Sequence, residues 1–170
     1  MRRVAVIGCG GAGKSTLARD LGRRLDLPVV HLDQHYWRPG WQRSEPAAWR
    51  EAQRRLVAEE AWVIDGNYLS TLELRVGAAD TVVFLDLPRW RCAWRATRRV
   101  ATGRGGANTA AGCPERLDRR HLRFLSYIWT FPANARPRVL ERLAEQQEST
   151  TILRLTKPSQ VRRFLTELTR

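Results

Sequence analysis

Five short runs of apolar, mostly β-branched residues recur along the chain, separated by longer stretches with helical spacing. Runs of this length, bounded by Gly, Pro or Asp, are typical of strands that are buried on both faces. The runs cover residues 4–7, 29–32, 62–65, 81–85 and 150–153. Strands that alternate with helices predict an α/β fold, in which a parallel sheet lies between two layers of helices.

Between these runs, apolar residues recur every three or four positions, which predicts helices. The expected helices cover residues 16–25, 45–60, 70–76, 90–101, 115–129, 137–147 and 158–168. Pro132 and Pro137 are expected to break and restart the helical pattern. Residues 34–43 are rich in aromatic side chains and lack such a period. Residues 102–114 are rich in Gly and Ala, and we expect them to form a mobile loop.

A glycine-rich turn joins the first predicted strand to the first helix, and it fits the pattern G-x-x-x-x-G-K-[ST] from Gly8 to Ser15. In such a loop the backbone N–H groups and the helix N-terminus bind phosphates, the lysine reaches the β- and γ-phosphates, and the hydroxyl binds Mg²⁺. Lys14 is therefore a candidate catalytic residue, and an ordinary glycine turn is the alternative. The residues expected to bind a nucleotide are Gly8, Gly10, Gly11, Ala12, Gly13, Lys14, Ser15 and Thr16.

Three carboxylates follow predicted strands, and the carboxyl ends of parallel strands share one edge of a sheet with the phosphate loop. Asp65, which precedes a glycine, is expected to bind Mg²⁺ together with Ser15. Asp33 is the candidate base or orienting carboxylate for a hydroxyl acceptor. Asp86 precedes Leu87 and a proline, and we expect it to be structural. For Asp33 and Asp65 the alternative is a side chain that caps a turn.

The composition favours one globular domain over residues 1–170, because 43% of the residues are hydrophobic and the length suits a single core. The longest apolar runs are far too short to span a membrane, and a strand begins at once, which leaves no room for a secretory signal. The three cysteines form no C-x-x-C pair, so reduced thiols and a cytoplasmic location are expected.

The charge is unevenly distributed. Of a net charge of +13, residues 88–142 contribute +10, from 13 Arg against 3 acidic residues. Such a field attracts nucleotides, phosphorylated substrates or nucleic acid. Arg95 and Arg99 are expected to reach the transferring phosphoryl group, with Arg116 and Arg120 approaching from the far side of a lid over residues 102–123. A solvated basic surface is the alternative for each of them.

The aromatic residues after Asp33 define a second candidate region, the acceptor side. Tyr36, Trp37, Trp41 and Trp49 have planar rings that could stack on an acceptor such as a base. A local hydrophobic cluster that holds the loop together is an equally good interpretation.

The order of these motifs resembles that of the adenylate-kinase-like nucleoside and nucleotide kinases. The resemblance rests on the phosphate loop, Asp33, the stretch 62–66, and the stretch 83–88 with Arg95 and Arg99 downstream. The phrases HLD (31–33), YWRPGW (36–41), DGNY (65–68) and GCPER (112–116) are similar to those of the group called DNA topology modulation protein, FlaR-like.

This resemblance implies a three-layer P-loop NTPase fold, with a five-stranded parallel sheet in the order 2-3-1-4-5, an acceptor-binding insert over residues 33–60 and a small lid. It also implies ATP and Mg²⁺. It places Arg95 and Arg99 on the adenine and the phosphates, Lys157 near the base, and Asn67 at the acceptor. The insert lacks the arginine of true adenylate kinases, and Arg38, Arg43 and Arg75 are the candidates to replace it.

The leading prediction is therefore a Mg²⁺-dependent kinase that transfers the γ-phosphoryl group of ATP to a nucleoside, a nucleotide or another small hydroxyl compound, as a monomer or homodimer. The alternative is a nucleic-acid-associated ATPase or regulator that uses the arginine-rich segment 88–142. A GTPase is disfavoured, because the sequence TKPS at 156–159 lacks the aspartate of a guanine-reading T-K-x-D.

Overall fold

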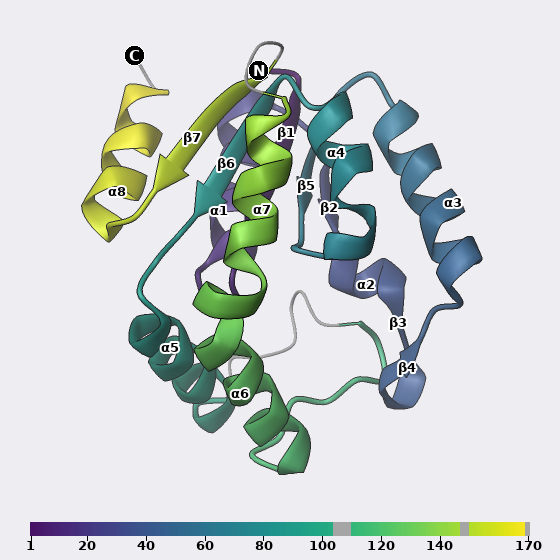
Figure 1. The fold of residues 1–170 in the computed structure, drawn as a ribbon, viewed down its shortest axis with the longest axis vertical. Coiled ribbons are helices and arrows are strands. Elements are labelled where there is room, and N and C mark those ends of the chain that lie inside the picture. Colours follow the sequence, from purple (N-terminus) through teal and green to yellow (C-terminus); the bar gives the residue numbers. More distant parts are fainter. Residues whose placement is uncertain (104–109, 147–149, 169–170) are drawn as a thin grey trace.

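A computed structural model describes residues 1–103, 110–146 and 150–168. Its centre is a five-stranded parallel sheet in the order β2-β5-β1-β6-β7 (Figure 1). The strands are β2 (Val29–His31), β5 (Trp62–Asp65), β1 (Arg3–Gly8), β6 (Thr81–Leu85) and β7 (Thr151–Leu155). Counted along the chain, these five strands have the order 2-3-1-4-5, which confirms the predicted fold.

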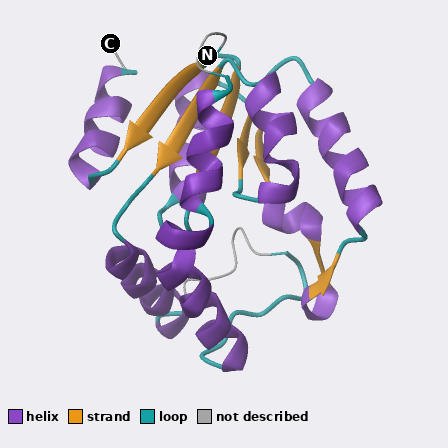
Figure 2. Cartoon of the chain, in the orientation of Figure 1, coloured by secondary structure: helices purple, strands orange, loops and turns teal. Residues whose placement is uncertain are grey.

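Helices cover both faces of the sheet (Figure 2). Helix α1 packs on β1, β2 and β5 from one side, while α4 and α7 lie together on the opposite side. Helix α3 packs on the outside of α4, and α5 and α6 pair below the carboxyl ends of the strands. The helices are α1 (Lys14–Leu25), α2 (Leu32–Tyr36), α3 (Pro46–Ala58), α4 (Leu72–Ala78), α5 (Arg89–Ala101), α6 (Arg119–Asn134), α7 (Arg136–Ala144) and α8 (Pro158–Glu167).

The register of the sheet decides which strand ends become neighbours. Strand β5 lies between β1 and β2, with Val6 opposite Asp65 and Asp65 opposite His31. Strand β5 is buried along its whole length and β1 at every position after Arg3, as their continuous apolar sequences predict. The phosphate loop and the predicted carboxylates therefore share one edge of the sheet.

The predicted helix over residues 115–129 is wrong at both ends. Helix α6 begins after Asp118, whose carboxylate accepts hydrogen bonds from the N–H groups of Arg120 and His121 at 2.8 and 3.1 Å. An aspartate N-cap of this kind starts a helix more strongly than the amphipathic pattern upstream of it. The helix also continues through Pro132 to Asn134, and the carbonyl of Ile128, which the proline leaves without its helical donor, accepts from the Cys9 thiol.

The aromatic segment after Asp33 is more ordered than a loop. Asp33 lies in the first turn of the short helix α2, and the antiparallel pair β3 (Trp37–Arg38) and β4 (Gln42–Arg43) follows. The indole rings of Trp37 and Trp41 meet edge to face at 5.5 Å and hold the hairpin closed. This hairpin is the outer part of the expected acceptor-binding insert.

Residues 112–114, in the middle of the expected lid, bond to this hairpin. The N–H of Gly40 donates to the carbonyl of Gly112 at 2.9 Å, and the indole of Trp41 donates to the carbonyl of Pro114 at 3.2 Å. The Cys113 thiol donates to the carbonyl of Arg38 at 3.1 Å. Residues 104–109 of the predicted mobile loop, and Gln147 at the predicted end of a helix, lie outside the described residues.

Within the described part of the chain, no helix combines the length and the apolar character that a membrane crossing requires.

Candidate active site

The phosphate loop is shaped by the residues that its motif predicts. Gly11 and Gly13 adopt positive φ angles of 74° and 101°, a conformation that favours glycine. Gly13 directly precedes α1, so the first N–H groups of that helix face the loop. The ammonium group of Lys14 donates to the carbonyl of Cys9 at 2.9 Å and so lies across the loop. Backbone N–H groups, a helix N-terminus and one ammonium group together fit a bound polyphosphate.

Helix α5 touches the loop from one side. A Cβ atom on Gly11 would lie only 2.2 Å from the carbonyl oxygen of Cys92, so backbone meets backbone here. One turn further on, the guanidinium group of Arg95 donates to the carbonyl of Ala12 at 3.1 Å. A Cβ atom on Gly13 would lie 2.9 Å from the same guanidinium group. The predicted catalytic residue Arg95 is therefore already at the phosphate loop.

Helix α6 touches the loop from the other side. The ring of Phe124 packs where a Cβ atom on Gly10 would be, at 2.4 Å. Pro132 has no N–H for the carbonyl of Ile128, and this carbonyl instead accepts a weak bond from the Cys9 thiol at 3.9 Å. A hydrogen bond with the Cys92 thiol, and burial, raise the pKa of the Cys9 thiol, so it stays protonated. Cys9 is thus a packed donor in the loop.

Asp65, the predicted metal ligand, is buried at the end of β5. One carboxylate oxygen lies 2.7 Å from Nδ1 of His31, the last residue of β2. The N–H of Gly66 donates to the carbonyl of Val6 at 3.2 Å, which holds this strand end beside the entrance to the phosphate loop. No local pattern pairs His31 with Asp65, since only the strand register makes them neighbours.

Asp33, the predicted acceptor carboxylate, receives a hydrogen bond from the hydroxyl of Tyr68 at 2.6 Å. Tyr68 follows β5, so this contact joins the ends of two adjacent strands. Its ring packs at 4.6 Å against Tyr36 and at 4.9 Å against Trp49, measured between ring centroids. Tyr36 and Trp37 are in edge contact at 4.9 Å within the same aromatic cluster. The rings pack together and one of them bonds to Asp33, while their stacking on an acceptor stays a prediction.

Asn67, the predicted acceptor residue between Asp65 and Tyr68, reaches helix α6. Its side-chain amide nitrogen donates to the hydroxyl of Tyr127 at 3.3 Å, while its side-chain oxygen, Oδ1, is buried without a hydrogen-bond partner. Burial is the main reason that the pKa of Tyr127 is raised to about 12. The end of β5 thus contacts the helix that also covers Gly10.

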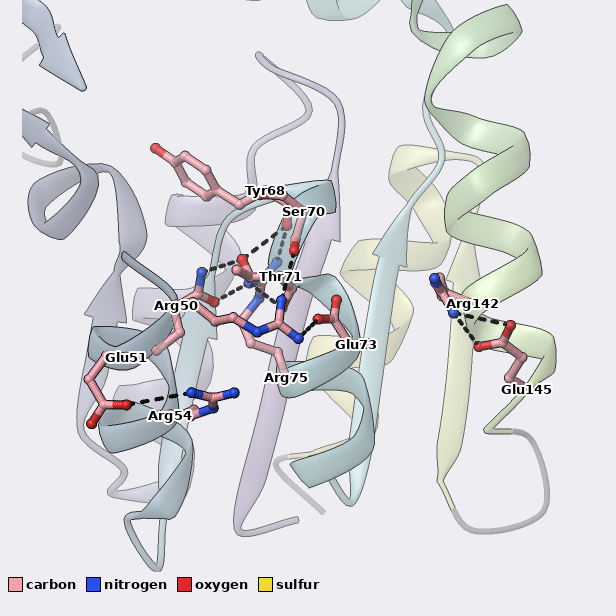
Figure 3. A network of polar contacts seen from close by, with 11 residues as sticks. Arg50, Glu51, Arg54, Tyr68, Ser70, Thr71, Glu73, Arg75, Arg142 and Glu145 are labelled. Carbon is pink, nitrogen blue, oxygen red and sulfur yellow. Dashed lines mark hydrogen bonds and ion pairs between the residues drawn. The ribbon is translucent and has the colours of Figure 1, made fainter. Parts of the chain in front are cut away.

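The assignment of Arg75 to the acceptor is wrong. Its side chain is fully buried beneath the turn between β5 and α4 (Figure 3). It donates to the side chain of Gln53, and to the backbone carbonyls of Gly66, Tyr68 and Thr71 at 3.3–3.4 Å. Burial lowers its pKa to about 10, which leaves it charged at neutral pH. Arg75 cross-links the turn from below and has no exposed surface to offer a substrate.

Arg99, predicted to touch the transferring phosphoryl group, forms an ion pair with Glu115 in this structure. Asp86 accepts bonds from Arg136 at 2.9 Å and Arg154 at 2.6 Å, so its structural role joins α7 to β7. The other predicted site residues are half-buried or exposed. They are Ser15 and Thr16 in α1, Arg38 and Trp41 in the hairpin, Arg116 and Arg120 around the start of α6, and Lys157 after β7.

No cluster of three or more His, Cys, Asp or Glu side chains suited to a metal ion occurs among the described residues. Ser15 and Asp65 nevertheless suit Mg²⁺, which takes one or two protein oxygens and completes its shell with phosphate oxygens and water. The site can therefore bind a polyphosphate and present two carboxylates beside it. Tyr68, His31 and Tyr127 were not among the predicted site residues, because each contacts a partner that is distant in sequence.

The fold is similar to those of solved small-molecule kinases. The chain matches shikimate kinase from Acinetobacter baumannii, solved with shikimate, at a TM-score of 0.63 and 15% identity, over 99% of this chain and 90% of that one. It matches shikimate kinase from Bacteroides thetaiotaomicron at 0.54 and 17%, over 98% and 96%. A sugar kinase from Janibacter sp. HTCC2649 matches at 0.51 and 18%, over 98% and 93%. The chain therefore has a P-loop kinase fold.

Comparison of sequences finds a distant, partial match. No protein-family model matches the chain. The uncharacterized protein YqaC of Bacillus subtilis (strain 168) is 27% identical over 90 residues, which are 52% of this chain and 51% of that protein. The match thus spans about half of that relative's length. The resemblance to the DNA topology modulation group stays a prediction.

We expect Gly11→Ala to lower the free energy of unfolding by at least about 2 kcal/mol and to abolish ATP binding, because a Cβ atom there forces α5 away from the loop. Gly77→Ala is the matched control. Gly77 is an exposed helical glycine with open space around it, so alanine should stabilise the protein by about 0.5 kcal/mol. Urea unfolding measures the change in stability for each variant. Equal changes for Gly11→Ala and Gly77→Ala would refute the close packing of α5 on the loop.

We expect Arg75→Met to lower the free energy of unfolding by about 2–4 kcal/mol, because it leaves buried carbonyl groups without donors. Arg50→Ala serves as the control. Arg50 forms a half-exposed ion pair with Glu73, and its loss should cost less than about 1 kcal/mol. A loss for Arg75→Met as small as that of the control would show that the buried network contributes little.

Proposed function

We propose that this protein is an ATP-dependent phosphotransferase that acts on a small hydroxyl compound. The observation that carries the proposal is the arrangement at one sheet edge. A phosphate loop with Lys14 and Arg95 lies beside two strand-end carboxylates, Asp65 and Asp33, each fixed by its own hydrogen-bond partner. Phosphoryl transfer needs positioning and charge neutralisation more than covalent chemistry, and this arrangement offers both.

Each group has a distinct proposed role. The loop N–H groups and Lys14 hold the β- and γ-phosphates of ATP, and Arg95 neutralises charge on the transferring group. Ser15 and Asp65 would hold Mg²⁺, which would neutralise negative charge on the phosphates. Asp33 accepts a hydrogen bond or the proton of the acceptor hydroxyl. Arg99 reaches the phosphates only after leaving Glu115, and Arg116 and Arg120 approach from the same segment.

The acceptor side favours a compact compound that carries a ring and hydroxyl groups. Asp33 accepts a hydrogen bond from Tyr68, whose ring belongs to an aromatic cluster, and the hairpin with Arg38 and Trp41 follows the helix that carries Asp33. Aromatic faces suit nucleoside bases and sugar rings alike. The solved relatives include a kinase in complex with shikimate and a sugar kinase, which adds hydroxy acids and sugars to the candidates.

The deciding experiment is an acceptor screen with γ-labelled ATP and Mg²⁺ across nucleosides, nucleotides, sugars and hydroxy acids such as shikimate. Transfer of label to one class identifies the acceptor. Release of inorganic phosphate alone, at the same rate with and without every acceptor, would contradict the kinase proposal.

The cysteines Cys9, Cys92 and Cys113 are free thiols, which supports assays under reducing, cytoplasm-like conditions.

The two halves of the proposed site can be separated by mutation. We expect Lys14→Ala to abolish ATP binding, measured by calorimetry with a non-hydrolysable ATP analogue, because the loop loses its only ammonium group. Asp33→Asn should leave the affinity for that analogue within about threefold and lower kcat at least about 100-fold. If Asp33→Asn instead weakens ATP binding as much as Lys14→Ala, then Asp33 belongs to the ATP–metal site.

One surface favours the second candidate function, nucleic-acid binding. Trp90, Trp94 and Trp129 are 61%, 58% and 50% exposed on α5 and α6. The guanidinium group of Arg89 lies 4.4 Å above the Trp129 ring, and that of Arg98 lies 5.2 Å from the Trp94 ring. Exposed aromatic rings interleaved with arginines suit single strands, whose bases stack while their phosphates pair with the arginines.

If this surface binds single-stranded DNA, Trp90→Ala and Trp94→Ala should each weaken binding of a thymidine oligonucleotide by about 5- to 100-fold. The affinity should also fall steeply with salt. Lys14→Ala is the control, because it removes ATP binding and leaves this surface intact. Binding that responds to Lys14→Ala and not to the tryptophan variants would place the oligonucleotide in the phosphate loop instead.

A further inference from the structure

The contact between Tyr68 and Asp33 is built more firmly than an incidental hydrogen bond. The hydroxyl of Tyr68 donates to one carboxylate oxygen, Oδ1, at 2.6 Å. Burial, followed by the neighbouring carboxylate charge of Asp33, raises the pKa of the Tyr68 phenol. The phenol therefore stays protonated and remains a donor throughout the physiological pH range.

The ring of Tyr68 packs against two aromatic neighbours that also contact each other, so the three rings form one cluster. Its centroid lies 4.6 Å from that of Tyr36 and 4.9 Å from that of Trp49. Trp49 is almost fully buried in α3, and Tyr36 ends α2, the helix that carries Asp33. Packing of this kind restricts the ring to one orientation, which keeps its hydroxyl on Asp33.

The backbone of Tyr68 is held from below. Arg75 donates to the carbonyls of Tyr68 at 3.3 Å and Gly66 at 3.4 Å, so the buried guanidinium group ties the turn to α4. Figure 3 shows the phenol of Tyr68 pointing away from this network. Burying an arginine whose hydrogen bonds go mainly to neutral oxygens is costly, and the turn that it braces carries Tyr68. The position of the phenol is thus set by ring packing above and by a buried cation below.

We propose that Tyr68 is a positioning residue for phosphoryl transfer: it occupies Oδ1 of Asp33 and so presents the other carboxylate oxygen to the acceptor hydroxyl. This inference rests on the proposed kinase function, in which Asp33 orients the acceptor. A carboxylate with one oxygen fixed has a defined plane, and a hydroxyl bound to the other oxygen lies in a defined direction relative to the γ-phosphate. Orientation of this kind acts on kcat more than on binding of ATP.

The kinetic test uses MgATP turnover of the full chain, with water as the acceptor, and repeats it with any acceptor that the screen identifies. Tyr68→Phe keeps the packed ring and removes only the hydroxyl. It should lower kcat by about 10- to 100-fold and leave the KM for ATP within about twofold. A kcat within twofold of the wild type would overturn the proposal.

A double-mutant cycle separates positioning from a general structural effect. In an Asp33→Ala background the hydroxyl of Tyr68 has no carboxylate to orient, so Tyr68→Phe should cost nothing further. If Tyr68→Phe lowers kcat by the same factor in both backgrounds, then Tyr68 does not act through Asp33 and the proposal fails.

The hydrogen bond itself can be tested without turnover. In NMR spectra of protein labelled at tyrosine Cζ, the Tyr68 hydroxyl proton should exchange slowly with water, and Tyr68→Phe assigns its signal. Asp33→Ala should accelerate this exchange at least about tenfold, and unchanged exchange would overturn the proposal. If the wild type turns over neither ATP nor any acceptor, the proposed function fails, while the exchange rates still decide whether Tyr68 holds Asp33.

Discussion

The close approach of α5 and α6 to the phosphate loop is the constraint on which the rest of the site depends. The loop has no side chains of its own at its glycines, so the helices come within contact distance of its backbone. Cys92 and Phe124 occupy the places where Cβ atoms would otherwise be, and Arg95 bonds to the carbonyl of Ala12. A phosphate-binding loop must keep its N–H groups aimed at one point, and this packing holds them there.

The same two helices connect the loop to the acceptor side. Helix α6 carries Phe124 against Gly10 and Tyr127 against Asn67, which follows Asp65 by two residues. The segment before α6 carries Glu115, which holds Arg99, and the residues that anchor to the hairpin. A movement of α6 or of this segment would therefore change contacts at the phosphate loop, at the end of β5 and at the hairpin together. This connectivity is compatible with the proposed kinase function.

The arginine-rich composition divides into arginines with internal partners and arginines at the surface. Arg75 is buried among carbonyl oxygens, Arg95 contacts the phosphate loop, and Arg136 pairs with Asp86. Arg89 and Arg98 instead lie over exposed tryptophan rings. The high net charge is therefore partly structural, and only its surface share is available to attract anionic ligands.

The sequence by itself determined the sheet, the phosphate loop and the shared edge of Asp33 and Asp65. Strand runs and the glycine motif are local patterns, and parallel topology then brings strand ends together. Only the tertiary structure decided the partners: His31 on Asp65, Tyr68 on Asp33, and Arg75 beneath the turn instead of at the acceptor. Such contacts join residues 7 to 35 positions apart in the chain, and their geometry depends on register, ring packing and burial, which no local pattern encodes.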